Sequence, residues 1–372
     1  MAAPHLHKVK AAEGSTRMPA ETFIEKIKNE SGGRLTSVSI YADPERTYQY
    51  YTKTKDDKSR TGIAYFVNPY TGEITGNSKE ENGMREFMST MFSLHRWLLL
   101  DKIETPLFSR ITNRELGSKI TGWATIIFTL GCITGMVIWV PQKVRNWKQG
   151  LKIKFNANWK RVNHDLHNTL AFYSLFLLLL MGITGPQWSF DWYRTGLQKS
   201  LGTYTEKKEA PAKKEKESEK VEVAPIASSS LPLSTLIQVA DTKLNYTGDY
   251  RITLPEKGDS MVAFNKTKIG FFAPAAADKI SINGISGQPG KVDIFSNKPI
   301  NERIAGSIKA IHIGNSYGTF TKILYFFACL IATSLPVTGT LIWLNRLKKR
   351  RKKKFANNAS LKTKRSEEIV LG

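Results

Sequence analysis

The sequence predicts an integral membrane protein that combines a transmembrane α-helical bundle with two extracytoplasmic α+β modules. Three apolar segments predict the bundle, because residues 120–140, 168–190 and 323–345 contain no Asp, Glu, Lys or Arg. About 20 apolar residues, at 1.5 Å each, cross the roughly 30 Å hydrocarbon layer of a bilayer. Each segment is therefore long enough to span the membrane once.

Two basic segments predict the orientation of these spans. Residues 142–163 contain seven Lys and Arg and no acid, and residues 346–372 contain eleven Lys and Arg and two Glu. Both segments directly follow an apolar segment, and such positively charged flanks lie in the cytoplasm. They also favour contact with anionic membrane lipid. A nucleic-acid partner is not expected, because no recognition module accompanies the charge.

This topology divides the chain into alternating membrane and aqueous segments. Residues 1–20 contain no apolar run that resembles a signal peptide or anchor. Either a further membrane helix lies upstream of Met1 or the orientation is reversed, and the agreement of the two basic segments favours the upstream helix. The predicted segments are an outer module (1–90), an interfacial helix region (91–117), a span (118–141), a cytoplasmic loop (142–163), a span (165–190), an outer linker segment (191–230), a second outer module (231–310), a span (318–345) and a cytoplasmic tail (346–372).

Both outer modules show the pattern of one helix followed by several strands. The first module is predicted to contain a helix at 19–28 and strands at 35–41, 47–54 and 62–68. The second is predicted to contain a helix at 233–242 and strands at 250–254, 261–265, 279–282 and 291–295. Residues 206–222 are dominated by Lys, Glu, Ala and Pro without any aromatic residue. Such a composition predicts a linker.

A Thr-Gly pair recurs in all three spans, at Thr134-Gly135, Thr184-Gly185 and Thr338-Gly339. Glycine allows a helix backbone or a planar ligand to approach closely, and threonine bonds within or between helices. Tight helix packing and a cofactor slot both remain open as interpretations. The two cysteines, Cys132 and Cys329, lie inside predicted spans and are interpreted as small packing residues.

Four of the six histidines lie at predicted membrane boundaries: His95, His164, His167 and His312. Imidazole is the commonest metal ligand in proteins and binds haem iron. His95 and His312 are predicted at the same outer surface and therefore qualify as an axial pair. His164 and His167 lie on one helix face and do not. The alternative is that these are simply interfacial polar residues. His5 and His7 lie in a polar segment that we expect to be flexible and without a metal.

Several short motifs together resemble the PepSY-associated transmembrane helix family. They occur in the family's order and cover nearly the whole chain: Ser93-Leu-His95-Arg-Trp97, Ile133-Thr-Gly-Met-Val-Ile-Trp139-Val-Pro141, Asp165-Leu-His167, Ile311-His312-Ile-Gly314 and Pro336-Val-Thr-Gly339. The run Phe66-Val-Asn-Pro-Tyr-Thr-Gly72 is similar to the strand-and-turn signature of a PepSY module. The chain departs from the family's four spans by lacking the first.

The resemblance implies a bacterial inner-membrane protein that reduces ferric siderophores with b-type haem. It implies that His95 and His312 ligate an outer haem, and that His167 ligates an inner haem opposite a histidine of the upstream helix. It further implies an electron donor in the cytoplasm or the membrane. No acid–base or nucleophilic constellation is evident, and a haem reductase needs none, because the cofactor supplies the chemistry.

Two functions from other classes compete with this hypothesis. A non-catalytic PepSY protein would bind or regulate a protease, or sense an envelope ligand, and its histidines would be interfacial residues. A transporter is the weaker alternative, because the apolar segments contain no Asp, Glu, Lys or Arg to couple an ion. The colour of the purified protein distinguishes the haem hypothesis from both alternatives.

Overall fold

The computed structural model describes residues 3–11, 14–55, 57, 62–140, 147–206, 231–255 and 259–371, with the side chains of all of these except 149, 354 and 357–371. The chain divides into two compact units. The sheet unit comprises Met1–Thr121, Gln187–Ile311 and Asn315–Thr321. The helical unit comprises Gly122–Pro186, His312–Gly314 and Lys322–Gly372. The linker predicted at 206–222 lies outside the described residues apart from Glu206.

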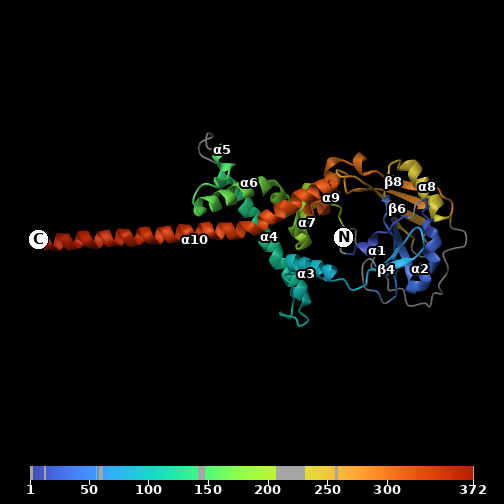
Figure 1. The fold of residues 1–372 in the computed structure, drawn as a ribbon, viewed down its shortest axis with the longest axis horizontal. Coiled ribbons are helices and arrows are strands. Elements are labelled where there is room, and N and C mark those ends of the chain that lie inside the picture. Colours follow the sequence, from blue (N-terminus) through green and yellow to red (C-terminus); the bar gives the residue numbers. More distant parts are fainter. Residues whose placement is uncertain are drawn as a thin grey trace. The chain divides into compact units, whose positions relative to one another are not determined.

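The strands of the sheet unit form one antiparallel, eight-stranded sheet with the order β4-β3-β2-β1-β5-β6-β7-β8 (Figure 1). Its first half consists of β1 (Arg34–Ile40), β2 (Tyr48–Lys53), β3 (Ile63–Val67) and β4 (Ile74–Asn77). Its second half consists of β5 (Gly248–Thr253), β6 (Met261–Lys268), β7 (Ala277–Asn283) and β8 (Pro289–Asp293). All strands except the short β4 lie where the sequence predicted strands.

The two predicted modules are joined edge to edge, because β1 pairs with β5. Val38 lies opposite Ile252 in this antiparallel pair. The amide of Leu254 donates to the Thr36 carbonyl at 2.9 Å, and the amide of Ala42 donates to Asp249 Oδ1 at 2.9 Å. The innermost strand of each half therefore has no unpaired edge at the junction. Among the strands that the structure describes, β4 and β8 form the edges of the sheet.

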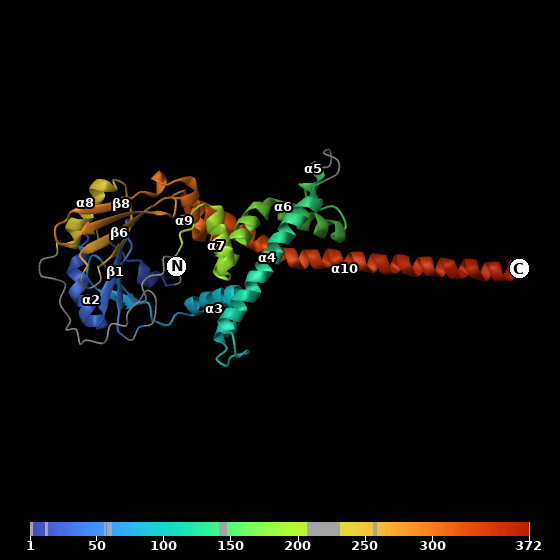
Figure 2. The ribbon, with the colours of Figure 1, turned by 180° about the vertical axis from the view of Figure 1, so that it is seen from behind.

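One face of the sheet is covered by helices from both halves. The first half contributes η1 (Ala20–Phe23) and α2 (Ile24–Ser31), and the second contributes α8 (Leu233–Lys243). Figures 1 and 2 show α2 and α8 on the same side of the sheet. Their apolar faces and the inward side of the strands form a single core, which includes Ile27, Val38, Ala240, Ile252 and Phe264. The sheet therefore has one continuous hydrophobic core rather than two.

The turn after β3 packs directly against this helical layer. The amide of Gly72 donates to the Asn68 carbonyl at 2.9 Å, and Asn68 Oδ1 accepts from the Tyr70 amide at 3.0 Å. Gly72 has a φ of +71°, and a Cβ there would lie 2.8 Å from the Phe23 ring. Glycine is therefore required both by the backbone conformation and by the close contact with η1.

The amino-terminal segment covers part of the opposite face of the sheet, and the expectation of a flexible end is wrong for residues 3–11. Its helix α1 (Pro4–His7) buries Ala3 and Leu6 against Ala64 and Phe66. The His7 ring lies edge-on to Phe66 at 4.6 Å between centroids. Burial, followed by the nearby charge of Arg46, lowers the pKa of His7. The sequence pattern missed this element because only one turn of helix is involved.

Three helices contain the predicted spans: α4 (Asn113–Trp139), α6 (Trp159–Thr184) and α10 (Gly318–Leu371). The segments Asn113–Trp139, Trp159–Trp188 and Gly318–Lys353 are long and apolar enough to cross a membrane. This confirms the prediction of a multi-pass membrane protein. The shorter helices are α3 (Gly83–Trp97), η2 (Leu100–Lys102), α5 (Trp147–Gly150), η4 (Pro186–Trp188), α7 (Asp191–Ser200), η5 (Phe295–Asn297) and α9 (Ile300–His312).

Helix α6 is the most enclosed of the three, with 33% of its apolar window buried against 6% in α4 and α10. Its contacts rely on small residues. A Cβ on Gly182 would clash with Thr129 of α4, and the Thr169 hydroxyl donates to the Gly150 carbonyl at 3.2 Å. Trp139 of α4 stacks on Phe172 at 4.3 Å. Small residues let membrane helices approach each other closely. The neighbouring helices pack around α6, which therefore lies at the centre of the helical unit.

We expect Ile252→Ala to destabilise both halves of the sheet together. Ile252 is fully buried in the shared core, and truncation of such a side chain costs about 2–5 kcal/mol. Pulse proteolysis of the full chain across a denaturant series measures the loss in each half. Thr253→Ala, on the exposed side of the same strand, is the control. New cleavage confined to the second half would contradict a single cooperative sheet.

Candidate functional site

Two of the predicted ligand histidines, His167 and His312, lie in the helical unit, at opposite ends of α6. His167 is on α6 itself, and His312 contacts Thr184 at the last turn of the same helix. The seventeen positions from residue 167 to residue 184 correspond to about 25 Å along a helix at 1.5 Å per residue. The two imidazoles are therefore separated by most of the thickness of the hydrocarbon layer.

His167 is bonded to α10 through the Thr338 hydroxyl. The distance from His167 Nδ1 to Thr338 Oγ1 is 2.9 Å. Thr338 Oγ1 also lies 3.0 Å from the Ser334 carbonyl, to which it donates its only proton. It therefore accepts from Nδ1–H of His167. This assigns the tautomer in which the lone pair that binds a metal is on Nε2.

His312 is held in the same way by α6. Its Nδ1 lies 3.0 Å from Thr184 Oγ1 and 3.1 Å from the Met181 carbonyl. The Thr184 hydroxyl donates to the Leu180 carbonyl at 2.6 Å. Both partners of Nδ1 are consequently acceptors, so Nδ1 carries the proton and Nε2 the lone pair. A partner on one ring nitrogen that orients the other is typical of metal-binding histidines.

The glycines of the two Thr-Gly pairs lie beside the same rings. A Cβ on Gly339 would lie 3.2 Å from His167 Cε1, and a Cβ on Gly185 would lie 3.4 Å from His312 Cε1. In each pair the threonine bonds an imidazole from a different segment and the glycine leaves room for it. The sequence showed the repeated pair but not its histidine partners, because these are 171 and 128 residues away along the chain.

The third pair has the same local geometry but a different environment. The Thr134 hydroxyl donates to the Leu130 carbonyl at 2.9 Å. Within the described part of the chain no histidine is bonded to Thr134, and nothing lies within 4 Å of a Cβ built on Gly135. Thr134 therefore provides a matched comparison for Thr184 and Thr338.

The start of α6 is fixed by polar contacts that explain the residues around His167. Asn163 Nδ2 donates to the Thr338 carbonyl at 3.1 Å, so it attaches the same turn to α10. Asp165 is buried and pairs with Arg161 at 2.8 Å. His164 lies next to the Asn168 amide, with 3.3 Å between the nearest nitrogens. His164 does not share the Thr338 contact of His167, which supports His167 as the candidate ligand of this pair.

His95 belongs to the sheet unit, where it is exposed near the end of α3. The helix is capped by Asn82 and carries an exposed apolar surface that includes Met84, Phe87, Met88 and Phe92. A Cβ on Gly117 would clash with the Trp97 backbone, so the end of α3 lies directly against the first turns of α4. This fixes the turn that carries His95 next to the start of a membrane span.

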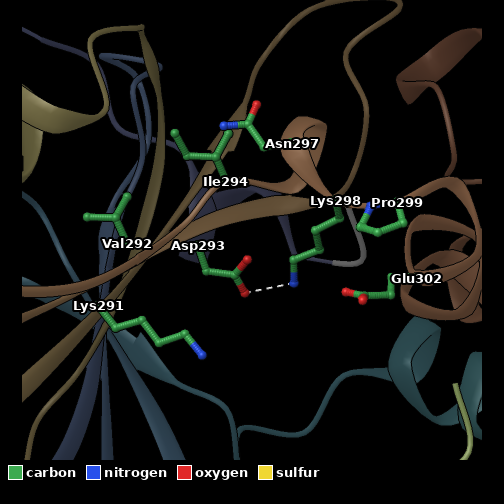
Figure 3. Close-up of a pocket in the computed structure, with 8 residues that line it drawn as sticks. All are labelled: Lys291, Val292, Asp293, Ile294, Asn297, Lys298, Pro299 and Glu302. Carbon is green, nitrogen blue, oxygen red and sulfur yellow. Dashed lines mark hydrogen bonds and ion pairs between the residues drawn. The ribbon is translucent and has the colours of Figure 1, made fainter.

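The rest of the described chain provides no comparable candidate centre. No group of three or more His, Cys, Asp and Glu side chains within these residues is arranged to hold a metal ion. An open hollow of about 480 Å³ lies beside β8 and the start of α9, where Lys298 pairs with Asp293 at 2.7 Å (Figure 3). Its lining contains no histidine or cysteine. The histidines bonded to Thr-Gly pairs are therefore the stronger candidates.

A family model described as the PepSY-associated TM region matches residues 1–346. The chain belongs to this family. The matched region of this PepSY-associated TM protein includes both halves of the sheet, the first two spans, most of the third span and all three candidate histidines. No match to a curated protein was found.

Proposed function

We propose that this PepSY-associated TM protein binds b-type haem and transfers electrons across the membrane. The observation that carries the proposal is the pair of imidazoles at opposite ends of α6, each with Nδ1–H bonded to a threonine. This arrangement supports Nε2 of His167 and of His312 as the nitrogen that binds the proposed ligand.

The residues fit a haem better than a bare metal ion. A porphyrin supplies four nitrogen ligands of its own, so the protein contributes only axial ligands, and single histidines suffice. His312 would hold one haem, with His95 as its second candidate ligand, and His167 would hold the other. Haem supplies one-electron redox chemistry when bound. The protein orients the imidazoles, spaces the two positions and encloses them in apolar helices.

The proposed substrate is a ferric siderophore or another extracytoplasmic ferric chelate. One electron converts Fe(III) to Fe(II), which hard oxygen chelators hold less tightly. The electron comes from a donor in the cytoplasm or the membrane. We further propose a bacterial inner-membrane location with a cytoplasmic carboxyl terminus and a periplasmic sheet. The basic residues after α4 and after the α10 span support this orientation.

An optical spectrum of the detergent-purified protein tests the proposal. We expect the sharp reduced bands of a low-spin b-type haem after dithionite, and reoxidation of those bands when a ferric chelate is added. An Fe(II)-specific dye should detect the released iron. A colourless protein, after expression with ample haem, would favour the non-catalytic PepSY function instead. If the reduced bands appear but a ferric chelate does not reoxidise them, the protein binds haem and the ferric chelate is not its substrate.

A further inference from the structure

The β6–β7 connection holds the first turn of α10. The amide of Phe320 donates to the Phe271 carbonyl at 3.2 Å, and Pro274 forms an isolated β-bridge with Tyr317. Gly318 has a φ of +58°, and a Cβ there would lie 2.8 Å from the carbonyl oxygens of Gly270 and Phe271. Only glycine permits this approach. The loop and the start of α10 therefore form one local structure within the sheet unit.

This loop carries an exposed aromatic cluster. The ring centroids of Phe271 and Phe272 are 4.8 Å apart, and those of Phe272 and Phe320 are 5.1 Å apart. Despite these contacts Phe271 is 51% exposed and Phe272 is 62% exposed. Ile269, two residues before Phe271 in the same loop, is also exposed. A contiguous exposed apolar patch of this kind marks an interaction surface.

The position of the cluster indicates what covers it. Phe320 lies in the first turn of the candidate span Gly318–Lys353, three residues before the uncharged segment 323–345 begins. The loop bonded to Phe320 therefore lies next to the start of the apolar part of α10. Aromatic side chains concentrate at this depth, with one side toward the acyl chains and the other toward the headgroups. Exposed Lys268 precedes the cluster in the chain and can extend toward lipid phosphates.

We propose that the β6–β7 loop inserts Phe271 and Phe272 into the headgroup–acyl boundary at the end of the bilayer where α10 begins. The loop then attaches the β6–β7 end of the sheet to the membrane surface, in addition to the covalent connection through α10. This inference concerns a lipid contact of an extramembrane domain, and it is independent of haem binding.

Spin labels at the two ends of β7 test the insertion in liposomes containing the full chain. Cys132 and Cys329 are first replaced by serine, and a nitroxide is attached at Phe272→Cys or, as the control, at Ile285→Cys. Ile285 is 53% exposed, like Phe272, but lies in the β7–β8 turn. Seven residues of strand at about 3.3 Å each separate these two ends by roughly 20 Å.

We expect the label at 272 to collide with oxygen, which concentrates in lipid, and to be shielded from a water-soluble nickel chelate. The label at 285 should behave in the opposite way. Equal nickel access at both positions would overturn the proposal. Shielding of 272 from both reagents would also overturn it, because that result indicates a protein partner in place of lipid. A label at Ile269→Cys, in the same loop, should give the same result as the label at 272. This second position shows whether the result depends on the Phe272→Cys substitution itself.

Discussion

Replacing His312 by alanine is expected to remove the haem bound at the end of α6 that contains Thr184. The substitution deletes the imidazole whose Nδ1 is bonded to Thr184 and Met181, and with it the proposed axial nitrogen. Loss of a ligand should weaken binding by more than the 10–100-fold that loss of an outer hydrogen-bond partner costs. Haem per chain, measured as the pyridine complex of the purified protein, should fall while the haem at His167 remains.

His5→Ala is the matched control for this experiment. His5 is exposed on α1 and takes no part in the helical unit, so its removal should leave the haem content unchanged. An unchanged haem content and an unchanged spectrum in His312→Ala would exclude His312 as a ligand. An equal loss in His167→Ala and His312→Ala, down to no haem at all, would indicate one shared site instead of two.

Thr338→Val is expected to weaken haem binding at His167 by about 10–100-fold without removing the ligand. Valine has nearly the shape of threonine but lacks the oxygen that accepts from His167 Nδ1 at 2.9 Å. The ring then loses the partner that fixes its orientation and tautomer. Transfer of haem to apomyoglobin measures the change in dissociation. Nitrogen NMR of the haem-free protein should also show an increased population of the Nε2–H tautomer of His167.

The third Thr-Gly pair supplies the control for this substitution. Thr134→Val removes the same hydroxyl, with the same bond to its own helix, from a position where the described residues place no histidine. It should change neither the haem affinity nor the histidine tautomers. Thr338→Ser should keep wild-type affinity, because the hydroxyl is retained. Equal effects of Thr338→Val and Thr134→Val would show that the hydroxyl acts through helix packing alone.

The spans and most of the strands follow from local sequence properties. A membrane-spanning helix must satisfy its backbone internally over about 20 residues, so an uncharged segment of this length is a sufficient signal. Strand patterns similarly predicted β1 to β3 and β5 to β8. Alternate residues of β5, β6 and β7 are buried, whereas no residue of β8 is fully buried. The short β4 contains Gly76 and Asn77 among its four residues. It shows no alternation of buried and exposed side chains. The length of the uncharged segments and the alternation of apolar and polar residues in the strands therefore determined the elements and the fold class.

The sequence also determined which residues were candidate ligands, because histidines near membrane boundaries are few. It could not determine their partners. The contacts of His167 with Thr338 and of Thr184 with His312 join residues more than 100 positions apart. No local period relates such residues. Only the packing of α6 with α10 and with the end of α9 showed that two of the three Thr-Gly pairs, Thr184-Gly185 and Thr338-Gly339, each hold an imidazole.

The joining of the two sheet halves was likewise decided by the tertiary structure. Alternation indicates which side of a strand is buried but not which strand lies beside it, so the β1–β5 pairing could not be read from the sequence. Alternation also places Lys266 in the core with Val262 and Phe264, where an ammonium group alone would be unfavourable. The Lys266 ammonium group donates to Asp241 Oδ1 at 2.5 Å and to the Leu244 carbonyl at 2.7 Å, and these bonds compensate for its burial. The sequence determined the elements because helices and strands depend on near neighbours, whereas these pairings depend on residues that only folding brings together.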